Sequence, residues 1–153
     1  MIRILFVCHG NICRSPMAEF IMKDLVSRRG LSPDIYIESA ATSREELGND
    51  MYPGAKAKLR AVGVPFERRE ARQITVRDYA RFDHIIVMDS FNLRNIQRII
   101  PADPNGKIRR LLDFTDRKKK DIADPWFSDD FDTAYRDILL GCEGLLDALT
   151  GQI

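Results

Sequence analysis

The stretch that decides the fold of this chain is Ile2-Arg3-Ile4-Leu5-Phe6-Val7, followed by Cys8-His9-Gly10-Asn11-Ile12-Cys13-Arg14-Ser15-Pro16. The apolar run over residues 2–7 predicts a buried β-strand, and residues 17–28 predict a helix after the loop. A loop that enters a helix N-terminus directs backbone N–H groups and the positive end of the helix dipole into one small space. The stretch therefore predicts an anion site at the end of the first strand.

Two side chains frame this predicted anion site. Cys8 begins the loop, and Arg14 follows after five intervening residues. The field that holds an anion also stabilises a thiolate, and the planar fork of a guanidinium matches phosphate oxygens. We therefore expect a phosphate-binding site with a nucleophilic Cys8 at its floor.

Three further loop residues suit this chemistry. Gly10 lets the backbone approach an anion closely and accepts a positive φ. Asn11 tolerates the left-handed region and is able to tie the loop together through its amide. Ser15 is placed to donate a hydrogen bond to the Cys8 sulfur, which favours the thiolate.

Composition sets limits on the class of protein. With 153 residues the chain is long enough for one domain with a substantial core, and we expect a single domain over residues 1–153. The net charge of +1 argues against a general nucleic-acid-binding protein. Apolar runs fall short of the ~20 residues of a membrane span, and no signal peptide is evident. Three cysteines favour a reducing compartment, so we expect a cytoplasmic location.

Predicted strands and helices alternate along the chain. Strands are predicted over residues 2–7, 34–39, 84–88 and 107–111, and helices over residues 17–28, 53–62, 91–100 and 129–149, with a long loop over residues 113–128. The alternation indicates an α/β fold with a parallel, doubly wound sheet and helices on both faces. Ligands of such folds bind beyond the carboxyl ends of the strands, where the Cys8 loop lies.

A second group of chemically useful residues lies in the long loop, at Asp124-Pro125-Trp126-Phe127. A thiolate that attacks phosphorus needs a group that protonates the departing oxygen. Asp124 is the candidate, first as general acid and then, toward water, as general base. Pro125 restricts the backbone at Asp124. Trp126 and Phe127 are candidates for the walls of a cleft that holds an aromatic leaving group.

The chain resembles the low-molecular-weight protein tyrosine phosphatases over nearly its whole length. The resemblance is carried by residues 8–16 with Met17-Ala18-Glu19, residues 39–43 with Gly48-Asn49, residues 71–74, Met88-Asp89 with Asn92, and Asp124-Pro125. It implies a four-stranded parallel sheet in the order 2-1-3-4 and no metal or other cofactor. It also implies that Cys8 is the nucleophile, that Arg14 binds the phosphate, and that Asp124 is the general acid and base.

The resemblance also assigns the phosphate-binding loop, which consists of His9, Gly10, Asn11, Ile12, Cys13, Arg14 and Ser15. Asn11 and Ser15 would support the loop, and the side chain of His9 is expected to point outward. For Cys13 the resemblance implies a reversible disulfide with Cys8 that protects the thiolate from deeper oxidation. A role as a small apolar filler behind the loop stays open beside it.

The activity implied by the resemblance is hydrolysis of protein phosphotyrosine monoesters through a cysteinyl-phosphate intermediate. The expected partners are tyrosine-phosphorylated proteins, with a tyrosine kinase as one candidate. Inorganic phosphate is expected as product and inhibitor. Neither nucleic acid nor a membrane is expected as a partner.

Three departures from the family pattern affect the expected site. Arg69 stands where well-studied eukaryotic relatives carry a histidine that contacts the loop asparagine, so the support of Asn11 is expected to differ. Glu45 stands where those relatives carry an aromatic residue, so one wall of the cleft is expected to be acidic and open. Trp126 and Phe127 replace a pair of tyrosines that can follow the Asp-Pro pair, and they are left to pack an aromatic substrate.

Two other activities fit parts of the sequence. Thiol-dependent arsenate reductases use a similar loop, but they need further cysteines, and none lies between Cys13 and Cys142, which is predicted to pack in the core. Protein arginine phosphatases carry a threonine where Ile12 stands, so Ile12 favours phosphotyrosine. Glu45, in contrast, suits a guanidinium. A phosphate-binding module without activity is disfavoured, because both expected catalytic groups are present.

Overall fold

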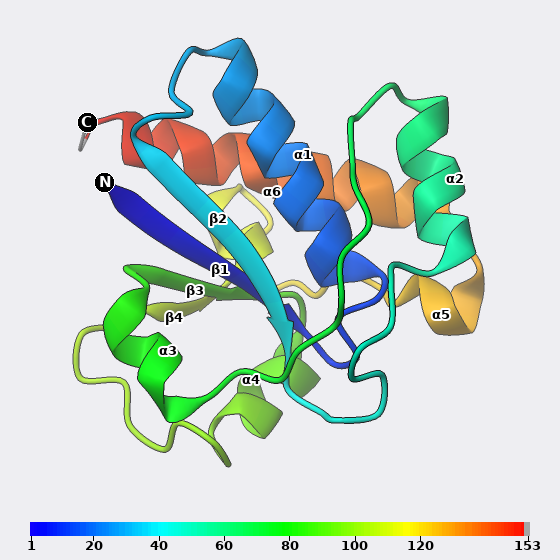
Figure 1. Cartoon of the computed structure of the whole chain (residues 1–153). Coiled ribbons are helices and arrows are strands. Elements are labelled where there is room, and N and C mark those ends of the chain that lie inside the picture. The colour runs from blue at the N-terminus through cyan, green and yellow to red at the C-terminus, as the bar shows by residue number, and fades with distance from the viewer. Residues whose placement is uncertain (152–153) are drawn as a thin grey trace.

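Four parallel strands form the centre of the structure, a computed structural model that describes residues 1–151. The strands are β1 (Ile2–Cys8), β2 (Ile35–Ala41), β3 (His84–Val87) and β4 (Ile108–Arg110). They pair in the order β2-β1-β3-β4, so the expected parallel sheet and its strand order are confirmed (Figure 1). The central strand β1 therefore ends, at Cys8, between two neighbours that run in the same direction.

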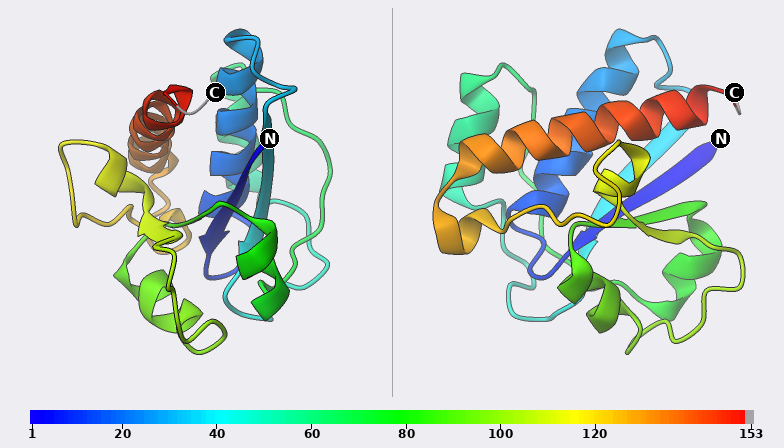
Figure 2. Two further views of the ribbon diagram at one scale, coloured as in Figure 1. Left: turned by 90° about the vertical axis from the view of Figure 1, so that its left-hand side faces the viewer. Right: turned by 180° about the vertical axis from the view of Figure 1, so that it is seen from behind.

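Helices cover both faces of this sheet (Figure 2). One face carries α1 (Arg14–Arg28), α2 (Pro53–Ala61) and α6 (Phe131–Thr150), and the other carries α3 (Val76–Arg81) and α4 (Ser90–Ile96). Side chains alternate along a strand, so Ile4 and Phe6 join the core under α1 and α6, whereas Leu5 and Val7 join the core on the opposite face. Both faces of β1 are buried, which explains its unbroken apolar run.

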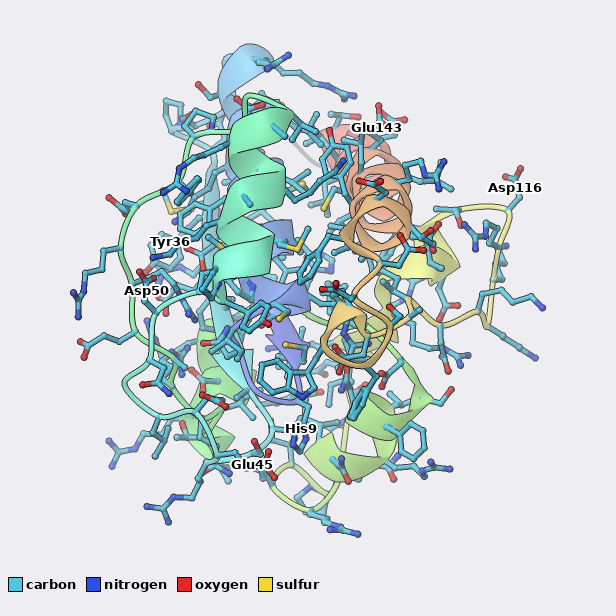
Figure 3. All side chains as sticks on the ribbon, turned by 90° about the vertical axis from the view of Figure 1, so that its right-hand side faces the viewer. His9, Tyr36, Glu45, Asp50, Asp116 and Glu143 are labelled. Carbon is cyan, nitrogen blue, oxygen red and sulfur yellow. The ribbon has the colours of Figure 1, made fainter. Side chains whose placement is uncertain are left out.

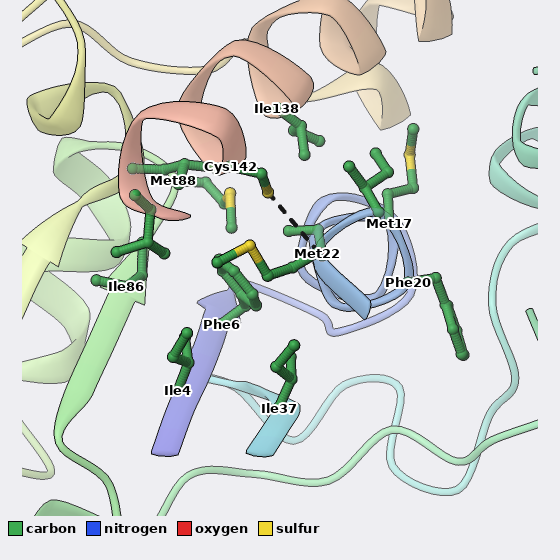
Figure 4. Packing of buried hydrophobic residues seen from close by; sticks show 14 of the residues in the cluster. Ile4, Phe6, Met17, Phe20, Met22, Ile37, Ile86, Met88, Ile138 and Cys142 are labelled. Carbon is green, nitrogen blue, oxygen red and sulfur yellow. Dashed lines mark hydrogen bonds between the residues drawn. The ribbon is translucent and has the colours of Figure 1, made fainter. Parts of the chain in front are cut away.

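The larger core holds α6 tightly against the rest of the domain. Cys142 of α6 is fully buried, as predicted, and its sulfur lies 3.9 Å from the Ala18 carbonyl oxygen of α1 (Figure 4). Burial raises the pKa of the Cys142 thiol, which therefore stays protonated. Gly144 permits the close approach of α6, because a Cβ there would lie 2.1 Å from the Phe114 carbonyl oxygen.

Three short helices were absent from the prediction. They are α3, the 3-10 helix η1 (Leu111–Phe114) and α5 (Pro125–Ser128), so the loop predicted over residues 113–128 is wrong at both ends. Helices this short show no periodic pattern and depend on local caps. Thr75 and Asp78 form a reciprocal capping box at α3, and the Asp124 side chain caps α5.

Several predicted boundaries were also wrong. The first helix begins at Arg14 rather than at residue 17, and α4 ends at Ile96 rather than at residue 100. The last helix begins at Phe131 rather than at residue 129, because the Asp130 side chain accepts a hydrogen bond from the Thr133 N–H and so caps it. Within residues 1–151, none of the helices combines the length and the apolar character that crossing a bilayer requires.

Candidate active site

The loop between β1 and α1 lies at the carboxyl end of the sheet, and neighbouring segments hold its main chain in place. The Thr42 N–H, just after β2, donates to the Cys8 carbonyl oxygen at 2.9 Å. The Tyr52 N–H, just before α2, donates to the Ile12 carbonyl oxygen at 2.8 Å. The predicted position of the loop, beyond the end of a central parallel strand, is confirmed.

The sharp turn of this loop is made at Asn11, whose φ is 60°. Asparagine reaches the left-handed region more easily than most residues, because its short polar side chain bonds locally. Gly10 has no positive φ, so its tolerance of one is not used in this loop. A Cβ at Gly10 would lie 3.4 Å from the Cγ of Glu46, an ordinary contact distance, so packing at this point does not require glycine.

Cys8 lies in a cavity of about 280 Å³ at this end of the sheet. Its walls come from the loop after β1, the loop after β2 and the segment around α5, namely Cys8, His9, Gly10, Ile12, Cys13, Arg14, Glu45, Glu46, Asp124, Trp126 and Phe127. The Cys8 sulfur lies 3.0 Å from Ser15 Oγ and accepts the Ser15 N–H at 3.4 Å. The three residues with expected catalytic roles, Cys8, Arg14 and Asp124, thus line one cavity.

Asn11 is fully buried, and both ends of its amide are bonded. Its Nδ2 donates to Ser15 Oγ at 2.7 Å and to Ser39 Oγ at 3.0 Å. Its Oδ1 accepts from the Arg69 guanidinium and from the Arg72 N–H at 3.3 Å. Arg69 therefore supports Asn11 in this chain, at the position where a histidine was expected from the family pattern.

These contacts set the direction of hydrogen bonding at the Cys8 sulfur. Because Ser15 Oγ accepts from Asn11, its own hydrogen is available for the Cys8 sulfur at 3.0 Å or for the Ala40 carbonyl oxygen at 3.4 Å. A Cys8 thiolate has no proton to donate, so it accepts this hydrogen and the Ser15 N–H. Hydrogen bonds to an ion are stronger than those between neutral groups. The Ser15 hydroxyl and the Ser15 N–H thus provide two donors to a thiolate at this position.

Arg14 is only 2% exposed and is held by its neighbours on several sides. Its Nη1 donates to Asp89 Oδ2 at 2.7 Å and to the Ile122 carbonyl oxygen at 2.8 Å, and its Nη2 lies 3.4 Å from Asp124 Oδ2. Burial alone would lower the pKa of Arg14, but the negative charges of Cys8, Asp89 and Asp124 outweigh it and raise that pKa. A fixed positive charge therefore lies beside the sulfur.

Asp124 forms the N-cap of α5, with Oδ1 accepting the Trp126 N–H at 3.0 Å. Its side chain is 23% exposed, so it borders the solvent side of the cavity. Pro125 occupies the first position of the helix, where its missing N–H costs nothing. Just before it, the Ile122 N–H donates to the Met88 carbonyl oxygen at 3.0 Å and ties this segment to the end of β3.

The aromatic residues after Asp124 differ in how firmly they are held. The Trp126 ring is 52% exposed and packs edge-on against Tyr52, with ring centroids 5.1 Å apart. Tyr52 also stacks on Phe131, with centroids 6.0 Å apart. Phe127 is 84% exposed and makes no ring pair within the part of the chain that the structure describes. Trp126 therefore lines the cavity with a ring held by Tyr52, whereas the Phe127 ring projects into solvent.

Acidic side chains line another part of the cavity mouth. His9 and Glu45 point toward one another there, with His9 Nε2 2.9 Å from Glu45 Oε2 (Figure 3). Both side chains are exposed, at 45% and 69%, so His9 lies at the rim rather than at the floor. Glu46 lines the cavity as well and was not foreseen. This wall carries two carboxylates, one more than expected.

Cys13 is buried and packs with Ile12 and Ala71, and it also lines the cavity. Burial, reinforced by the negative charges of Cys8 and Asp124, raises the pKa of its thiol to about 12. Cys13 is therefore a neutral thiol in the resting protein. Its contacts fit the role of an apolar filler, and the redox role rests on the family resemblance.

Residues outside the expected set complete the site. Asp89 binds Arg14 at the end of β3, and Ser39 in β2 accepts from Asn11 and donates to Glu19 Oε1 at 2.6 Å. Carboxyl ends of parallel strands meet at one edge of a sheet, and that rule alone would have singled out Asp89 and Ser39. Glu19 lies on α1, and only the fold brings it to the network.

Fold and cavity together define the class of this protein. It is an α/β protein in which a cysteine, an arginine and the start of a helix line one cavity at the carboxyl end of a parallel sheet. No group of three or more His, Cys, Asp or Glu side chains within residues 1–151 is placed to hold a metal ion.

Comparison with known proteins shows the family. A family model described as low molecular weight phosphotyrosine protein phosphatase matches residues 3–153. The chain belongs to this family.

Individual relatives match over nearly their whole length. The low molecular weight protein-tyrosine-phosphatase YfkJ of Bacillus subtilis is 39% identical over 150 residues, which cover 97% of this chain and 96% of YfkJ. The crystal structure of YfkJ superimposes with a TM-score of 0.94 at 37% identity, covering 99% and 96% of the two chains. A Drosophila arginine phosphatase structure has a TM-score of 0.84 at 34% identity, covering 95% of this chain and 96% of its own.

Proposed function

We propose that this protein hydrolyses phosphotyrosine monoesters in proteins through a cysteinyl-phosphate intermediate. One observation carries the proposal: a single cavity holds the Cys8 sulfur, the Arg14 guanidinium and the Asp124 carboxylate. Arg14 Nη2 lies 3.4 Å from Asp124 Oδ2, so the residue expected to bind the phosphate and the expected acid can both contact the same substrate group. The names of the relatives support it, since YfkJ is a protein-tyrosine-phosphatase.

In the first step the Cys8 thiolate attacks phosphorus, and an S–P bond forms as the bond from phosphorus to the tyrosine oxygen breaks. Backbone N–H groups at the start of α1 and the fork of Arg14 bind the equatorial oxygens of the transferring group. Asp124 enters this step protonated and gives its proton to the tyrosine oxygen. The carboxyl group needs access to that oxygen, which its place at the solvent side of the cavity allows.

In the second step a water molecule hydrolyses the cysteinyl-phosphate. Asp124, now a carboxylate, accepts a proton from the water as the new O–P bond forms and the S–P bond breaks. Inorganic phosphate leaves, and the Cys8 thiolate is restored. The Ser15 hydroxyl, 3.0 Å from the sulfur, stabilises that departing thiolate.

The walls of the cavity favour an aromatic phosphate ester. Trp126, Phe127 and Ile12 provide apolar surface between the solvent and the sulfur. The phenolic ring of phosphotyrosine reaches from the cavity mouth to the sulfur and gains contact with the aromatic side chains. The short side chain of phosphoserine does neither. We therefore expect selection of phosphotyrosine by reach and by packing.

A parallel assay of phosphotyrosine, phosphoserine and phosphoarginine peptides of otherwise identical sequence tests the proposal. We expect kcat/KM for phosphotyrosine to exceed that for phosphoserine by at least about 100-fold, because the latter loses both reach and ring contacts. Preferential release from phosphoserine would refute the proposed function.

Phosphoarginine hydrolysis is a second candidate, favoured by two observations. Glu45 and Glu46 bring carboxylates to the cavity mouth, and a Drosophila arginine phosphatase has a similar structure. If phosphoarginine is the substrate, Glu45→Gln should lower kcat/KM for phosphoarginine peptides several-fold. The variant should then hydrolyse phosphotyrosine peptides better than phosphoarginine peptides. Glu143→Gln, a charge removal on α6 far from the cavity (Figure 3), is the matched control.

We also propose a protective disulfide between Cys8 and Cys13 in a reducing, cytoplasmic setting. Peroxide would oxidise the Cys8 thiolate to a sulfenic acid, and attack by the Cys13 sulfur would then form the disulfide and release water. The raised pKa of Cys13 makes this second reaction slow at neutral pH. Mass spectrometry after mild peroxide treatment tests the idea, and the absence of a Cys8–Cys13 linkage removes it.

A further inference from the structure

Tyr52 joins the two halves of the cavity. Its main-chain N–H donates to the Ile12 carbonyl oxygen of the phosphate-binding loop at 2.8 Å. Its ring meets Trp126 edge-on, with centroids 5.1 Å apart and planes at 69°, and stacks on Phe131 at 6.0 Å and 10°. One residue therefore contacts the loop that carries Cys8 and the segment that carries Asp124.

The segment around α5 is tied to β3 and to Arg14 just before Asp124, but its exposed aromatic side chains have few partners. The helix has four residues, far below the length at which a helix is stable by itself. Trp126 and Phe127 are largely exposed, and the Asp124 side chain is bonded to the Trp126 N–H. Movement of Trp126 would therefore move the Asp124 carboxyl group.

Tyr52 contacts both ends of this segment, since Trp126 lies inside α5 and Phe131 begins α6. Gly54 makes the second contact possible, because a Cβ there would lie 2.6 Å from the Phe131 ring. Within residues 1–151, Tyr52 contacts these neighbours through its ring and its main-chain N–H.

We infer that Tyr52 is a positioning residue that holds Asp124 at the leaving-group oxygen through Trp126. This inference rests on the proposed function, in which Asp124 is the general acid. A correctly placed acid accelerates such reactions by about 100-fold to 10,000-fold, and displacement of about 1 Å is enough to lose much of that gain. Tyr52 touches no reacting atom and acts only through this placement.

The test compares two substrates, phenyl phosphate, whose leaving group needs a proton, and a dinitrophenyl phosphate, whose leaving group does not. We expect Tyr52→Ala to lower kcat/KM, which reports the step in which the leaving group departs, by about tenfold for phenyl phosphate and by less than about twofold for the activated ester. The step that hydrolyses the cysteinyl-phosphate is common to both substrates and does not enter this comparison. Tyr52→Phe keeps the ring and should restore kcat/KM for phenyl phosphate. Equal losses on both substrates, or no loss on either, would overturn the inference.

Two controls separate positioning from loss of stability. Phe66→Ala removes another half-buried ring, one that packs edge-on against Phe20 at 6.3 Å, and it should lower the melting temperature without changing the ratio of the two rates. In an Asp124→Ala background, Tyr52→Ala should no longer alter that ratio, because its partner is gone. A change of the ratio in either control would refute the inference.

The same experiment distinguishes this inference from the proposed function. If Asp124→Ala alone lowers kcat/KM for both substrates equally, Asp124 is not the acid and the proposed mechanism fails. If Asp124→Ala shows the expected difference and Tyr52→Ala does not, the mechanism stands and the role of Tyr52 is refuted.

Discussion

The two halves of the cavity are built in opposite ways. The expected phosphate-binding loop is buried and held by hydrogen bonds, with Asn11 and Ser15 at 0% exposure and Arg14 at 2%. The segment after Asp124 is open, with Trp126 at 52% and Phe127 at 84%. One half is held by a network of hydrogen bonds, and the other by a helix cap and a few ring contacts.

The difference matches what each half has to do in the proposed reaction. Charge that develops on a phosphoryl group is stabilised best by dipoles that are already in place, so the loop benefits from rigidity. The segment with the acid has to admit a protein substrate and release a product, which requires exposed surface. Substitutions in the two halves should therefore fail in different ways.

The largest effect is expected at the buried half. Cys8→Ser should lower kcat by at least ~1000-fold, because the hydroxyl is not ionised near neutral pH. Inorganic phosphate or vanadate should still bind, since the backbone N–H groups and Arg14 remain. Steady-state assays and calorimetric titration with phosphate measure both properties, and substantial turnover by this variant would exclude Cys8 as the nucleophile.

Arg14→Lys tests whether the geometry of the fork matters beyond its charge. A lysine keeps the positive charge near Asp89 but cannot bind two phosphate oxygens in one plane. We expect kcat to fall by about 100-fold or more, with melting temperature as the check on folding. A loss of less than threefold would show that charge alone suffices in this half.

Asp124→Ala removes the expected general acid from the open half of the cavity. We expect kcat/KM to fall by about 100-fold for phosphotyrosine peptides and by much less for activated aryl phosphates, because the leaving groups of the latter need no proton. The contrast with Arg14→Lys is the informative part, since that variant should slow both substrate types. Equal slowing of both by Asp124→Ala would remove its role as leaving-group acid.

The smallest effect concerns the support of the buried half. Burial alone would raise the pKa of Asp50, but hydrogen bonds from Lys56 and from two main-chain N–H groups lower it from 3.8 to about 2. One of those N–H groups belongs to Arg69, which binds Asn11. Asp50 therefore helps to hold the segment that supports the loop.

A pKa that is lower in the folded than in the unfolded state stabilises the protein above the unfolded value and loses this contribution as pH falls through the folded value. Since the Asp50 carboxylate is partly solvated, Asp50→Asn should cost about 1 kcal/mol at neutral pH. Urea denaturation should show the gap to the wild type closing between about pH 4 and pH 2. A gap that is independent of pH would contradict this account.

Much of the fold was predictable, because it follows from local patterns. Unbroken apolar runs predicted the buried strands. The alternation of strands with helices predicted a parallel sheet, which the structure confirms. The misses were the short helices α3, η1 and α5, of which α3 and α5 are capped by single side chains, as at Thr75 with Asp78. Periodicity does not detect a single turn of helix.

The candidate site was predictable in part. Cys8, Arg14 and Ser15 lie in one continuous stretch, so their proximity follows from the strand-loop-helix pattern. The position of Asp124 relative to them rested on family resemblance. No role was predicted for two residues that orient the site: Asp89 lies at a strand end, where the position of ligand sites in parallel sheets would have indicated it, whereas Tyr52 bears no local signature of its contacts.

The sequence by itself determined the half of the cavity that carries Cys8, since a strand, a loop of fixed length and a helix start bring the thiol, the guanidinium and the amides between them together. Only the tertiary structure decided which carboxylates pair with Arg14, which residues bind the Asn11 amide, and where the Asp124 side chain lies. Those answers depend on pairs separated by more than fifty residues, such as Arg69 with Asn11 and Arg14 with Asp124, at 58 and 110 positions. Contacts over such separations arise from the packing of the whole sheet and its helices, and no local pattern encodes them.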